Sequence, residues 1–528
     1  MNRERLKSDL AGDVFDVVVV GGGASGLGVA VDAASRGYRT ALFESHDFAK
    51  ATSSRSTKLV HGGVRYLEQM NFSLVMEALR ERGLLYANAP HIVTDLAFIV
   101  PSYKWWEGPF YGVGLKLYDA LAGKLNLEKS RHLGREATIE AIPNVQQEGL
   151  DGGTMYHDGQ FDDARLAVTL ARTAVDHGAV VLNRMRVMEL LKEDGHIDRV
   201  RVRDEESGEM HEVRASVVVN ATGIFSDEVR RLDDPDAVGM IEPAQGVHLV
   251  LDRSFGPGDN AIMVPHTDDG RVLFVIPWHD RVLVGTTDTP MKTAELEPRA
   301  LDEEVEFILR NAARYMAKDP TPDDVLGVFA GQRPLVHRGG TDASSKSISR
   351  SHEVVVSGSG LVSIMGGKWT TFRKMAEDTM EHAIEVGMLE PRPCVTEGLH
   401  LHGWMDREDP DMPVDDVRRF YGSDAAALEA LVAEDPGLGK PLHEHLPYRG
   451  AEVVWAVRHE MALSVEDVLA RRTRSLLLDA RASIESAPSV ASIMAGELGR
   501  DAAWERDEVE SYRALASGYV LGDMQSQA

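Results

Sequence analysis

Cysteine is nearly absent from this 528-residue sequence, which contains Cys394 alone. An intramolecular disulfide, a redox-active cysteine pair and a multi-cysteine metal or iron–sulfur site are therefore excluded, and a reducing compartment is favoured. The pairs H-L-H at 400–402 and H-E-H at 443–445 have no partners at ligand spacing, and the zinc motif H-E-x-x-H does not occur. We expect no metal site.

Positive charge and long apolar runs are also scarce. The net charge is −27, so a broad basic surface for nucleic acid is not expected. No apolar run approaches the roughly 18 residues that a membrane span needs. Residues 1–10 are polar and lack the apolar core of a signal peptide. We therefore expect a cytoplasmic protein, and its length predicts two or three domains.

A dinucleotide-binding βαβ unit is predicted at the start of the chain. The apolar, β-branched run 14–20 is typical of a buried parallel strand, and the motif G-x-G-x-x-G at 21–26 follows it directly. A helix is predicted next, and the following strand ends at Glu44. The glycines allow a tight turn, close approach of a pyrophosphate and close helix packing. An acid at the end of the second strand is placed to bind a ribose diol.

The βαβ unit alone leaves NAD and FAD open, and three later segments favour FAD. These are A-T-S-S-R-S-T-K (51–58), N-A-T-G (220–223) and G-G-K-W-T-T (366–371). Small hydroxylic residues and glycines donate hydrogen bonds to phosphate and ribityl oxygens without blocking an extended cofactor. No second G-x-G-x-x-G follows a strand, so we expect no separate nicotinamide site, and the electrons come from the substrate.

These segments, with S-T-K-L-V-H-G-G-V-R-Y-L-E at 56–68 and G-Q-R-P-L at 331–335, resemble the FAD-dependent glycerol-3-phosphate dehydrogenases, which are quinone-linked respiratory enzymes. The resembling blocks follow the family's order over about residues 14–377. In the C-terminal region, the segments around 454–462 and 470–474 are similar to the longer members. The departures are small: Phe372 stands where the family pattern has Tyr, and Gln332 where it more often has Val.

The resemblance implies oxidation of sn-glycerol 3-phosphate to dihydroxyacetone phosphate, with the C2 hydride passing to FAD and the electrons to a membrane quinone. His61 is the candidate base for the hydroxyl proton, because imidazole titrates near neutral pH; the alternative is that it only packs near the flavin. Arg333 is the candidate for stabilising the developing alkoxide, and Asp288 is interpreted as an orienting acid. Arginine forks suit a phosphate dianion, and the candidate substrate-binding residues are Arg65, Tyr66, Arg350 and Lys368.

The cofactor-binding residues predicted from the motifs and the resemblance come from five short segments. They are Gly21, Gly23, Ala24, Ser25, Gly26, Glu44, Thr52, Ser53, Ser54, Lys58, His61, Gly62, Gly63, Ala221, Thr222, Gly223, Gly366, Gly367, Lys368 and Thr370. We interpret Gly62 and Gly63 as the place where the backbone passes close to the flavin ring.

The fold class expected is α/β. The overall pattern resembles the D-amino-acid-oxidase group, with a glutathione-reductase-like FAD-binding Rossmann domain, an antiparallel-sheet substrate domain and, here, a helical C-terminal domain. The boundaries expected are 14–90, 150–235 and 354–388 for the FAD-binding domain, 91–149 and 236–353 for the substrate domain, 389–415 for a linker, and 416–528 for the C-terminal domain.

Residues 101–125 raise the question of a membrane surface. Their aromatic and basic residues favour either an interfacial patch or a core helix over the substrate domain: Trp105, Trp106, Phe110, Tyr111, Tyr118, Lys104, Lys116 and Lys124. A quinone acceptor favours the patch, and with it a peripheral position on the inner face of the cell membrane. A homo-oligomer stays open.

Three alternatives remain at this point. A glycerol-3-phosphate oxidase would pass the electrons to O2. An amine or amino-acid oxidase of the same fold would bind a substrate carboxylate with Arg333. A flavin-binding scaffold would bind FAD without turnover.

Overall fold

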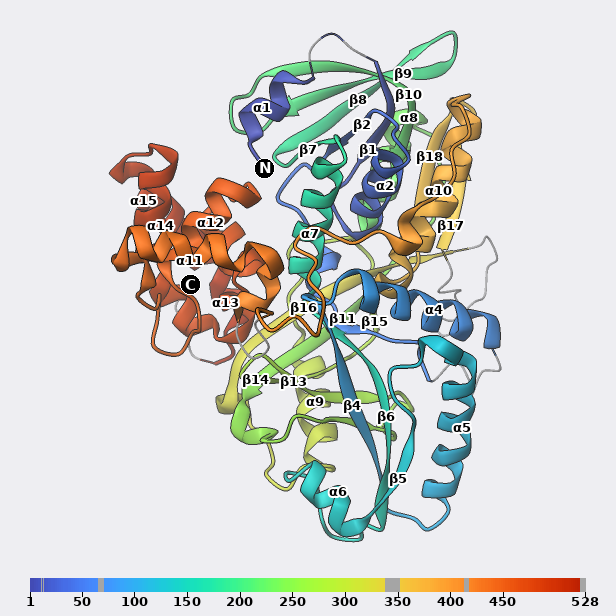
Figure 1. Ribbon diagram of the computed structural model, residues 1–528, viewed down its shortest axis with the longest axis vertical. Coiled ribbons are helices and arrows are strands. Elements are labelled where there is room, and N and C mark those ends of the chain that lie inside the picture. The colour runs from blue at the N-terminus through green and yellow to red at the C-terminus, as the bar shows by residue number, and fades with distance from the viewer. Residues whose placement is uncertain (11, 13, 65–70, 338–351, 413–416, 523–528) are drawn as a thin grey trace.

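The computed structural model describes residues 1–10, 12, 14–64, 71–337, 352–412 and 417–522. Figure 1 shows an upper α/β half that contains the N-terminus and a lower half built on a second sheet. The C-terminal helices lie at the side of both halves.

The upper half is built on a mostly parallel sheet with the strand order β17–β18–β10–β1–β2–β7. Only β17 runs antiparallel to its neighbour on this path, and β8 and β9 extend β10 as an antiparallel ribbon. The strands are β1 (Phe15–Val20), β2 (Thr40–Phe43), β7 (Val180–Leu182), β8 (Met185–Glu193), β9 (His196–Asp204), β10 (Met210–Asn220), β17 (His352–Val356) and β18 (Leu361–Gly366). The helices are α1 (Arg3–Ser8), α2 (Ala24–Ser35), α7 (Asp163–Asp176), α8 (Ser226–Asp233) and α10 (Phe372–Val386).

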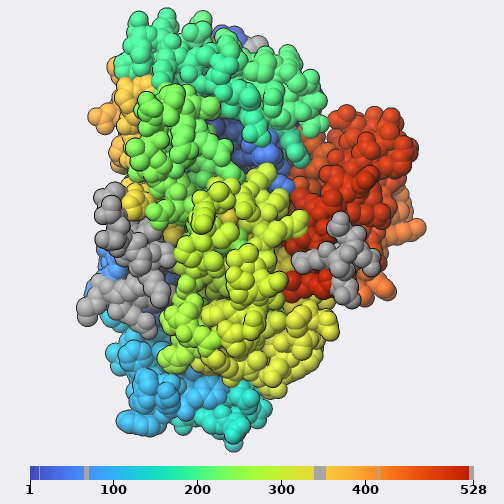
Figure 2. Space-filling view, turned by 180° about the vertical axis from the view of Figure 1, so that it is seen from behind, coloured from blue at the N-terminus to red at the C-terminus, as the bar shows by residue number. Residues whose placement is uncertain are grey.

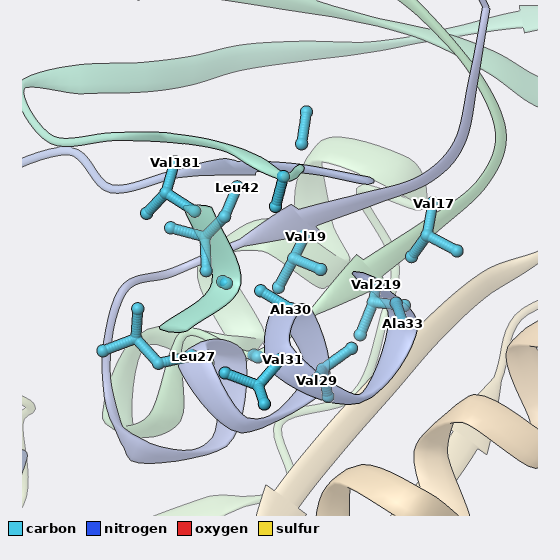
Figure 3. Packing of buried hydrophobic residues seen from close by; sticks show 14 of the residues in the cluster. Val17, Val19, Leu27, Val29, Ala30, Val31, Ala33, Leu42, Val181 and Val219 are labelled. Atoms are coloured by element: carbon cyan, nitrogen blue, oxygen red, sulfur yellow. The ribbon is translucent and has the colours of Figure 1, made fainter. Parts of the chain in front are cut away.

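The centre of this half is the packing of α2 against β1. Val17 and Val19 are fully buried, and Figure 3 shows them with Leu27, Ala30 and Leu42 in one apolar cluster. Because β1 is covered on both faces, its sequence is a continuous apolar run. The predicted strand–helix–strand unit is therefore confirmed, and its helix begins at Ala24, after the N-cap Gly23 and within the glycine motif.

The lower half is a largely antiparallel sheet with the strand order β15–β11–β14–β13–β12–β4–β6–β3, in which β16 also pairs with β11 and β5 with β6. The strands are β3 (Leu59–Val60), β4 (Val93–Ser102), β5 (Arg131–Gly134), β6 (Gly152–Phe161), β11 (Ile241–Asp252), β12 (Ala261–Val264), β13 (Leu273–Trp278), β14 (Arg281–Gly285), β15 (Thr289–Pro290) and β16 (Val325–Val336). The helices of this half are α4 (Phe72–Asn88), α5 (Glu107–Ala122), α6 (Arg135–Ala141) and α9 (Asp302–Ala313).

Two strands lie in a different sheet from the one the sequence indicated. Strands β3 and β6 belong to segments assigned to the FAD-binding domain, but both pair in the second sheet, where β6 runs along the whole of β4. The physical reason is that an apolar run indicates a strand but does not say which partner strand it meets.

The C-terminal region is helical, as expected, and it shares a core with the second sheet. Its α-helices are α11 (Ala425–Glu434), α12 (Gly450–Glu460), α13 (Ser475–Leu478), α14 (Ala480–Leu498) and α15 (Ala502–Ala516). Leu476, Leu477 and Val490 belong to the same buried cluster as Phe98 and Phe329. The expected fold class is confirmed, and the C-terminal helices are packed onto the rest of the chain rather than held at a distance.

A buried histidine near the junction with the C-terminal region gives a test of this packing. Burial, assisted by the nearby Arg165, lowers the pKa of His91 to about 3. An unfolded histidine titrates near 6.5, so the unfolded chain binds a proton that the folded chain excludes. The associated stability is fully present above about pH 6.5 and is lost as the pH falls from there toward 3.

We expect His91→Gln to reduce the loss of unfolding free energy between pH 7 and pH 5 by about 2 kcal/mol. Urea unfolding of both proteins at the two pH values measures this difference, and any pH-independent cost of the substitution cancels. An unchanged difference between the two pH values would show that His91 can be protonated in the folded protein.

Candidate active site

The glycine motif forms a cradle between β1 and α2 that tolerates no side chain. Gly21 has φ +107°, and a Cβ there would lie 2.8 Å from the Ala221 carbonyl oxygen. A Cβ on Gly26 would lie 1.9 Å from the Gly21 carbonyl oxygen. The first turn of α2 follows Gly23, which has no side chain to cap it. A helix N-terminus of this kind attracts phosphate, because its N–H groups and its dipole favour negative charge.

Glu44, at the end of β2, is held in a defined orientation beside this cradle. Its Oε2 accepts a hydrogen bond from the Gly22 N–H at 2.6 Å, and its Oε1 accepts one from the His46 N–H at 2.7 Å. Burial raises the pKa of Glu44, and these two N–H groups oppose that shift. The carboxyl group is thus placed where the sequence predicted a ribose ligand.

A cavity of about 510 Å³ runs along the cradle and Glu44, within the range of roughly 300–1,000 Å³ that is common for cofactor sites. In Figure 2 the blue N-terminal part of the chain is visible in a hollow between the green and yellow-green parts of the surface. The structure brings segments distant in sequence to this cavity. The predicted residues that line it are Gly21, Gly23, Ala24, Ser25, Glu44, Thr52, Ser53, Ala221, Thr222, Gly223, Gly366, Gly367 and Lys368.

Other predicted residues lie outside the cavity lining. They are Gly26, Ser54, Lys58, His61, Gly62, Gly63 and Thr370. Arg65, Tyr66 and Arg350 lie outside the described residues.

Lys58, one of the predicted cofactor ligands, is bound within the protein. Its side chain is fully buried, and its Nζ donates to Asp163 Oδ2 at 2.7 Å and to the Ser54 carbonyl oxygen at 2.8 Å. Burial lowers the pKa of Lys58 to about 8, and the Asp163 carboxylate opposes that shift. The ammonium group stabilises the segment that carries Thr52 and Ser53 from within, and does not itself line the cavity.

The need for glycine at position 62 has a cause that the sequence did not reveal. Its N–H donates to the Tyr118 hydroxyl at 2.7 Å, and a Cβ on Gly62 would lie 2.5 Å from that oxygen and 2.7 Å from Leu79. The Tyr118 hydroxyl in turn donates to Asp158 at 2.8 Å. Glycine at 62 is therefore required by packing against Tyr118. The preceding N–H, that of His61, donates to Thr370 Oγ1 at 3.2 Å, next to the cavity residues Lys368 and Trp369.

Arg333 lies on β16, next to Pro334, which lines the cavity. Several hydrogen bonds fix the orientation of its guanidinium group. It donates to Asp288 Oδ1 at 3.1 Å, to Thr286 Oγ1 at 3.3 Å and to the Thr287 carbonyl oxygen at 3.1 Å. The Arg333 side chain is 28% exposed. A Cβ on Gly246, on the neighbouring strand β11, would lie 2.4 Å from the guanidinium, which explains the glycine there.

His248 is a buried histidine next to Arg333 that the sequence reasoning did not identify. Its Nε2 lies 3.0 Å from Thr57 Oγ1, and its ring stacks on Phe329. Burial lowers its pKa well below the usual range, and the positive charges of Lys58 and Arg333 add to the effect. The imidazole is thus neutral at pH 7. The available signal was a polar residue inside the apolar run V-H-L-V-L at 247–251.

Three basic residues of the cavity wall were also missed, as were the polar residues Ser45 and Glu228. The basic residues are His46, Lys50 and Arg186. Burial lowers the pKa of His46 to about 4, and Arg186 contributes. Lys50 directly precedes the predicted 51–58 segment, which was a usable signal, whereas no local motif marks Arg186.

Two family models match the chain. The model described as FAD dependent oxidoreductase matches residues 16–373, and the model described as C-terminal domain of alpha-glycerophosphate oxidase matches residues 361–505. The chain is 40% identical to mitochondrial glycerol-3-phosphate dehydrogenase of Bos taurus over 94% of this chain and 72% of that protein. It is also 40% identical to the probable mitochondrial glycerol-3-phosphate dehydrogenase of Caenorhabditis elegans, over 96% of this chain and 73% of that protein.

Solved structures show the same likeness. The crystal structure of glycerol-3-phosphate dehydrogenase from Bacillus halodurans, complexed with FAD, superposes with a TM-score of 0.79 at 30% identity and covers 98% of both chains. The FAD-bound L-alpha-glycerophosphate oxidase from Mycoplasma pneumoniae, at 17% identity and a TM-score of 0.56, shares the fold over 74% of this chain and 98% of that chain.

The cavity fits FAD, the cofactor of this family. The glycine cradle and the N-terminus of α2 form the turn that binds a pyrophosphate in such folds, and Glu44 is oriented beside it, where this family of folds binds a ribose. The small residues of 52–53, 221–223 and 366–367 leave the remaining length of the cavity open.

We expect Gly26→Ala to abolish FAD retention, because its Cβ would force α2 away from the Gly21 carbonyl and displace the phosphate site. The ratio of flavin to protein absorbance in the purified enzyme measures this. Gly496→Ala is the matched control, since nothing lies within 4 Å of a Cβ at that helical position. Full flavin occupancy in the Gly26 variant would refute the close packing described for the cradle.

Proposed function

The chain belongs to the FAD-dependent glycerol-3-phosphate dehydrogenases, and we propose on that basis that it oxidises sn-glycerol 3-phosphate to dihydroxyacetone phosphate. FAD, when bound, supplies the hydride acceptor for C2 of the substrate. The single observation that supports this substrate most directly is the guanidinium group of Arg333. It is oriented by Asp288 and partly exposed beside the cavity.

In the proposed reaction, the residues of this chain bind the phosphate group of the substrate and remove the proton of its 2-hydroxyl group. In a chain of net charge −27, a phosphorylated substrate needs a local positive site, and an immobilised guanidinium provides one. Arg333 binds the polyol phosphate and stabilises negative charge that develops on the 2-oxygen, because its donors are already oriented. Lys368 lines the cavity and adds positive charge. Arg65, Tyr66 and Arg350 complete the proposed substrate-binding set.

His61 is the proposed proton acceptor for the 2-hydroxyl group. Its backbone N–H donates to Thr370 Oγ1, two residues from the cavity residue Lys368, and this contact near the cavity supports the proposal. The neutral imidazole of His248 is also able to accept a proton, but it is buried behind Thr57. A pH profile of kcat/KM in His61→Asn and in His248→Asn distinguishes the two. The acidic limb of the profile disappears only in the variant that lacks the true base.

Substrate-dependent bleaching of the flavin under anaerobic conditions tests the proposed substrate. We expect glycerol 3-phosphate to bleach the flavin and amino acids not to bleach it. Arg333→Met should lower kcat/KM for glycerol 3-phosphate by about 10²-fold, the usual cost of removing one oriented donor. Arg310→Met, an exposed arginine on α9, is the control.

Bleaching by an amino acid instead of glycerol 3-phosphate would favour the amine or amino-acid oxidase alternative. Bound FAD that no substrate bleaches would favour a scaffold. Full activity of the Arg333 variant would show that Arg333 does not bind the substrate.

We propose further that the electrons pass to a membrane quinone and that α5 is the surface that meets the bilayer. Within the described residues, no helix combines the length and apolarity needed to cross a membrane. The outer side of α5 and the segment before it expose a set of large apolar side chains, which we name the lipid face: Trp105, Trp106, Phe110, Val113 and Leu117. Trp105 is 81% and Val113 is 73% exposed.

The charge around the lipid face supports a bilayer rather than a protein partner. Between residues 103 and 131 there are five basic and three acidic residues, an excess of positive charge in an acidic chain. Tryptophan with lysine is the composition that binds the interface of anionic membranes. Figure 1 shows α5 on the outer side of the lower half. Tyr118 of the expected patch does not take part, because it is buried against Asp158.

We expect the combined variant Trp105→Ser, Trp106→Ser, Phe110→Ser to bind anionic phospholipid vesicles at least about tenfold more weakly. It should lose activity with a vesicle-embedded quinone and keep activity with a soluble dye. Met388→Ser, at an exposed apolar residue after α10, is the control.

Stopped-flow reoxidation of the reduced wild-type enzyme completes this test. Fast reaction with O2 and none with quinone would establish the oxidase alternative, and unchanged vesicle binding by the triple variant would eliminate the lipid face. Both expected results together would establish peripheral binding to a membrane, and we propose the inner face of the cell membrane as its place.

A further inference from the structure

One of the segments that line the cofactor site, residues 50–58, is in contact with the C-terminal region, and we name it the cofactor loop. Thr52 and Ser53 of this loop line the cavity, and Ser53 Oγ accepts a hydrogen bond from the Ala24 N–H, the first residue of α2, at 3.0 Å. The loop is therefore in direct contact with the phosphate cradle, and a shift of the loop changes the cradle.

We propose that the C-terminal region is a brace for this loop, and that Arg474 and Tyr519 are positioning residues for FAD. Neither residue lines the cavity. Arg474 binds the loop at Ser54 and Tyr519 binds it at Arg55. Both residues are distant in sequence from the nucleotide-binding motif.

Arg474 is the first and stronger contact. Its side chain is 1% exposed, and its guanidinium donates to the Ser54 carbonyl oxygen at 2.7 Å and to Asp163 Oδ1 at 3.0 Å. The same two acceptors, the Ser54 carbonyl and the Asp163 carboxylate, also bind Lys58. Two cations thus share one carboxylate and one loop carbonyl, so loss of Arg474 leaves both acceptors incompletely paired in a buried site.

Tyr519 is the second contact. Its hydroxyl donates to Glu297 Oε2 at 2.9 Å and accepts from Arg55 at 3.1 Å, while Arg55 donates to the Leu296 carbonyl oxygen at 2.7 Å. Leu296 also lines the cavity. Tyr519 therefore fixes the Arg55 side chain of the loop and, through it, one wall of the cavity.

The C-terminal region also binds residues 47–50, which lead into the cofactor loop. Arg472 makes two hydrogen bonds with the Asp47 carboxylate, at 2.7 and 2.8 Å, and Lys50 at the start of the loop pairs with Glu466. Buried ion pairs contribute little net stability, because the desolvation of the charges offsets their attraction. A set of buried ion pairs directed at one loop is better explained by the geometry that it imposes than by stability alone.

The competing explanation is that these contacts only attach the C-terminal region to the rest of the chain. The pair between Arg165 on α7 and Glu460 on α12 provides a matched control, because it is a buried, bidentate ion pair of the same interface at 2.8 Å that does not touch the cofactor loop. The substitution Glu460→Gln removes the charge of this pair and of the 3.8 Å contact of Glu460 with Arg472, but it leaves the contacts of Arg474 and Tyr519 with the loop in place.

The experiment measures the dissociation constant of FAD by diluting each holoenzyme and following the flavin fluorescence, together with the thermal midpoint of each protein. We expect Arg474→Met to weaken FAD binding at least about tenfold, Arg474→Lys to restore most of it, and Tyr519→Phe to weaken it about threefold. Glu460→Gln should lower the midpoint and change FAD binding less than about twofold.

The proposal is overturned if Glu460→Gln and Arg474→Met weaken FAD binding equally for an equal loss of thermal midpoint. It is also overturned if the folded Arg474 variants bind FAD as the wild type does. If Arg474→Met fails to fold, Tyr519→Phe decides alone. It removes a single hydroxyl, and unchanged FAD binding in that variant would exclude the brace.

Discussion

Asp163, in the first turn of α7, forms ion pairs with Lys58 and Arg474 in a part of the molecule that water does not reach. It also accepts hydrogen bonds from the N–H and hydroxyl of Ser56, so four donors from two distant segments meet on one carboxylate. Removing either cation leaves buried charge uncompensated, which is far more costly than the pair is stabilising. The cofactor loop, one wall of the cavity and the C-terminal region are therefore fixed relative to one another.

The substrate side that we propose contains a second, more exposed arrangement of charge. Arg333 is oriented by Asp288 and by two threonines, and Gly246 leaves space for the guanidinium on the adjacent strand. The two arrangements meet at His248, whose pKa is lowered first by burial and further by the positive charges of Lys58 and Arg333. An acidic protein thereby keeps a compact positive region where an anionic substrate and a diphosphate cofactor are needed.

The sequence predicted what depends on local order along the chain. The β1–α2–β2 unit, the glycine cradle, Glu44 and the segments at 221–223 and 366–368 all meet at the cavity, because each lies at the end of a strand of one parallel sheet. It did not predict the surroundings of Lys58, Gly62 or His248. Their partners are separated from them by many residues, and a lysine or glycine in a polar motif looks the same whether it meets a cofactor or a buried carboxylate.

The order of these segments along the chain has a consequence for how the enzyme is made. A ribosome releases the glycine cradle first, but Gly366 and Lys368, which complete the cavity, follow more than 300 residues later, and Arg474 and Tyr519 come later still. During synthesis the cradle is exposed without its opposite wall and without the contacts that hold the cofactor loop. With the brace that we propose, flavin insertion is expected at the end of translation, and a chain truncated before residue 474 is expected to retain FAD poorly.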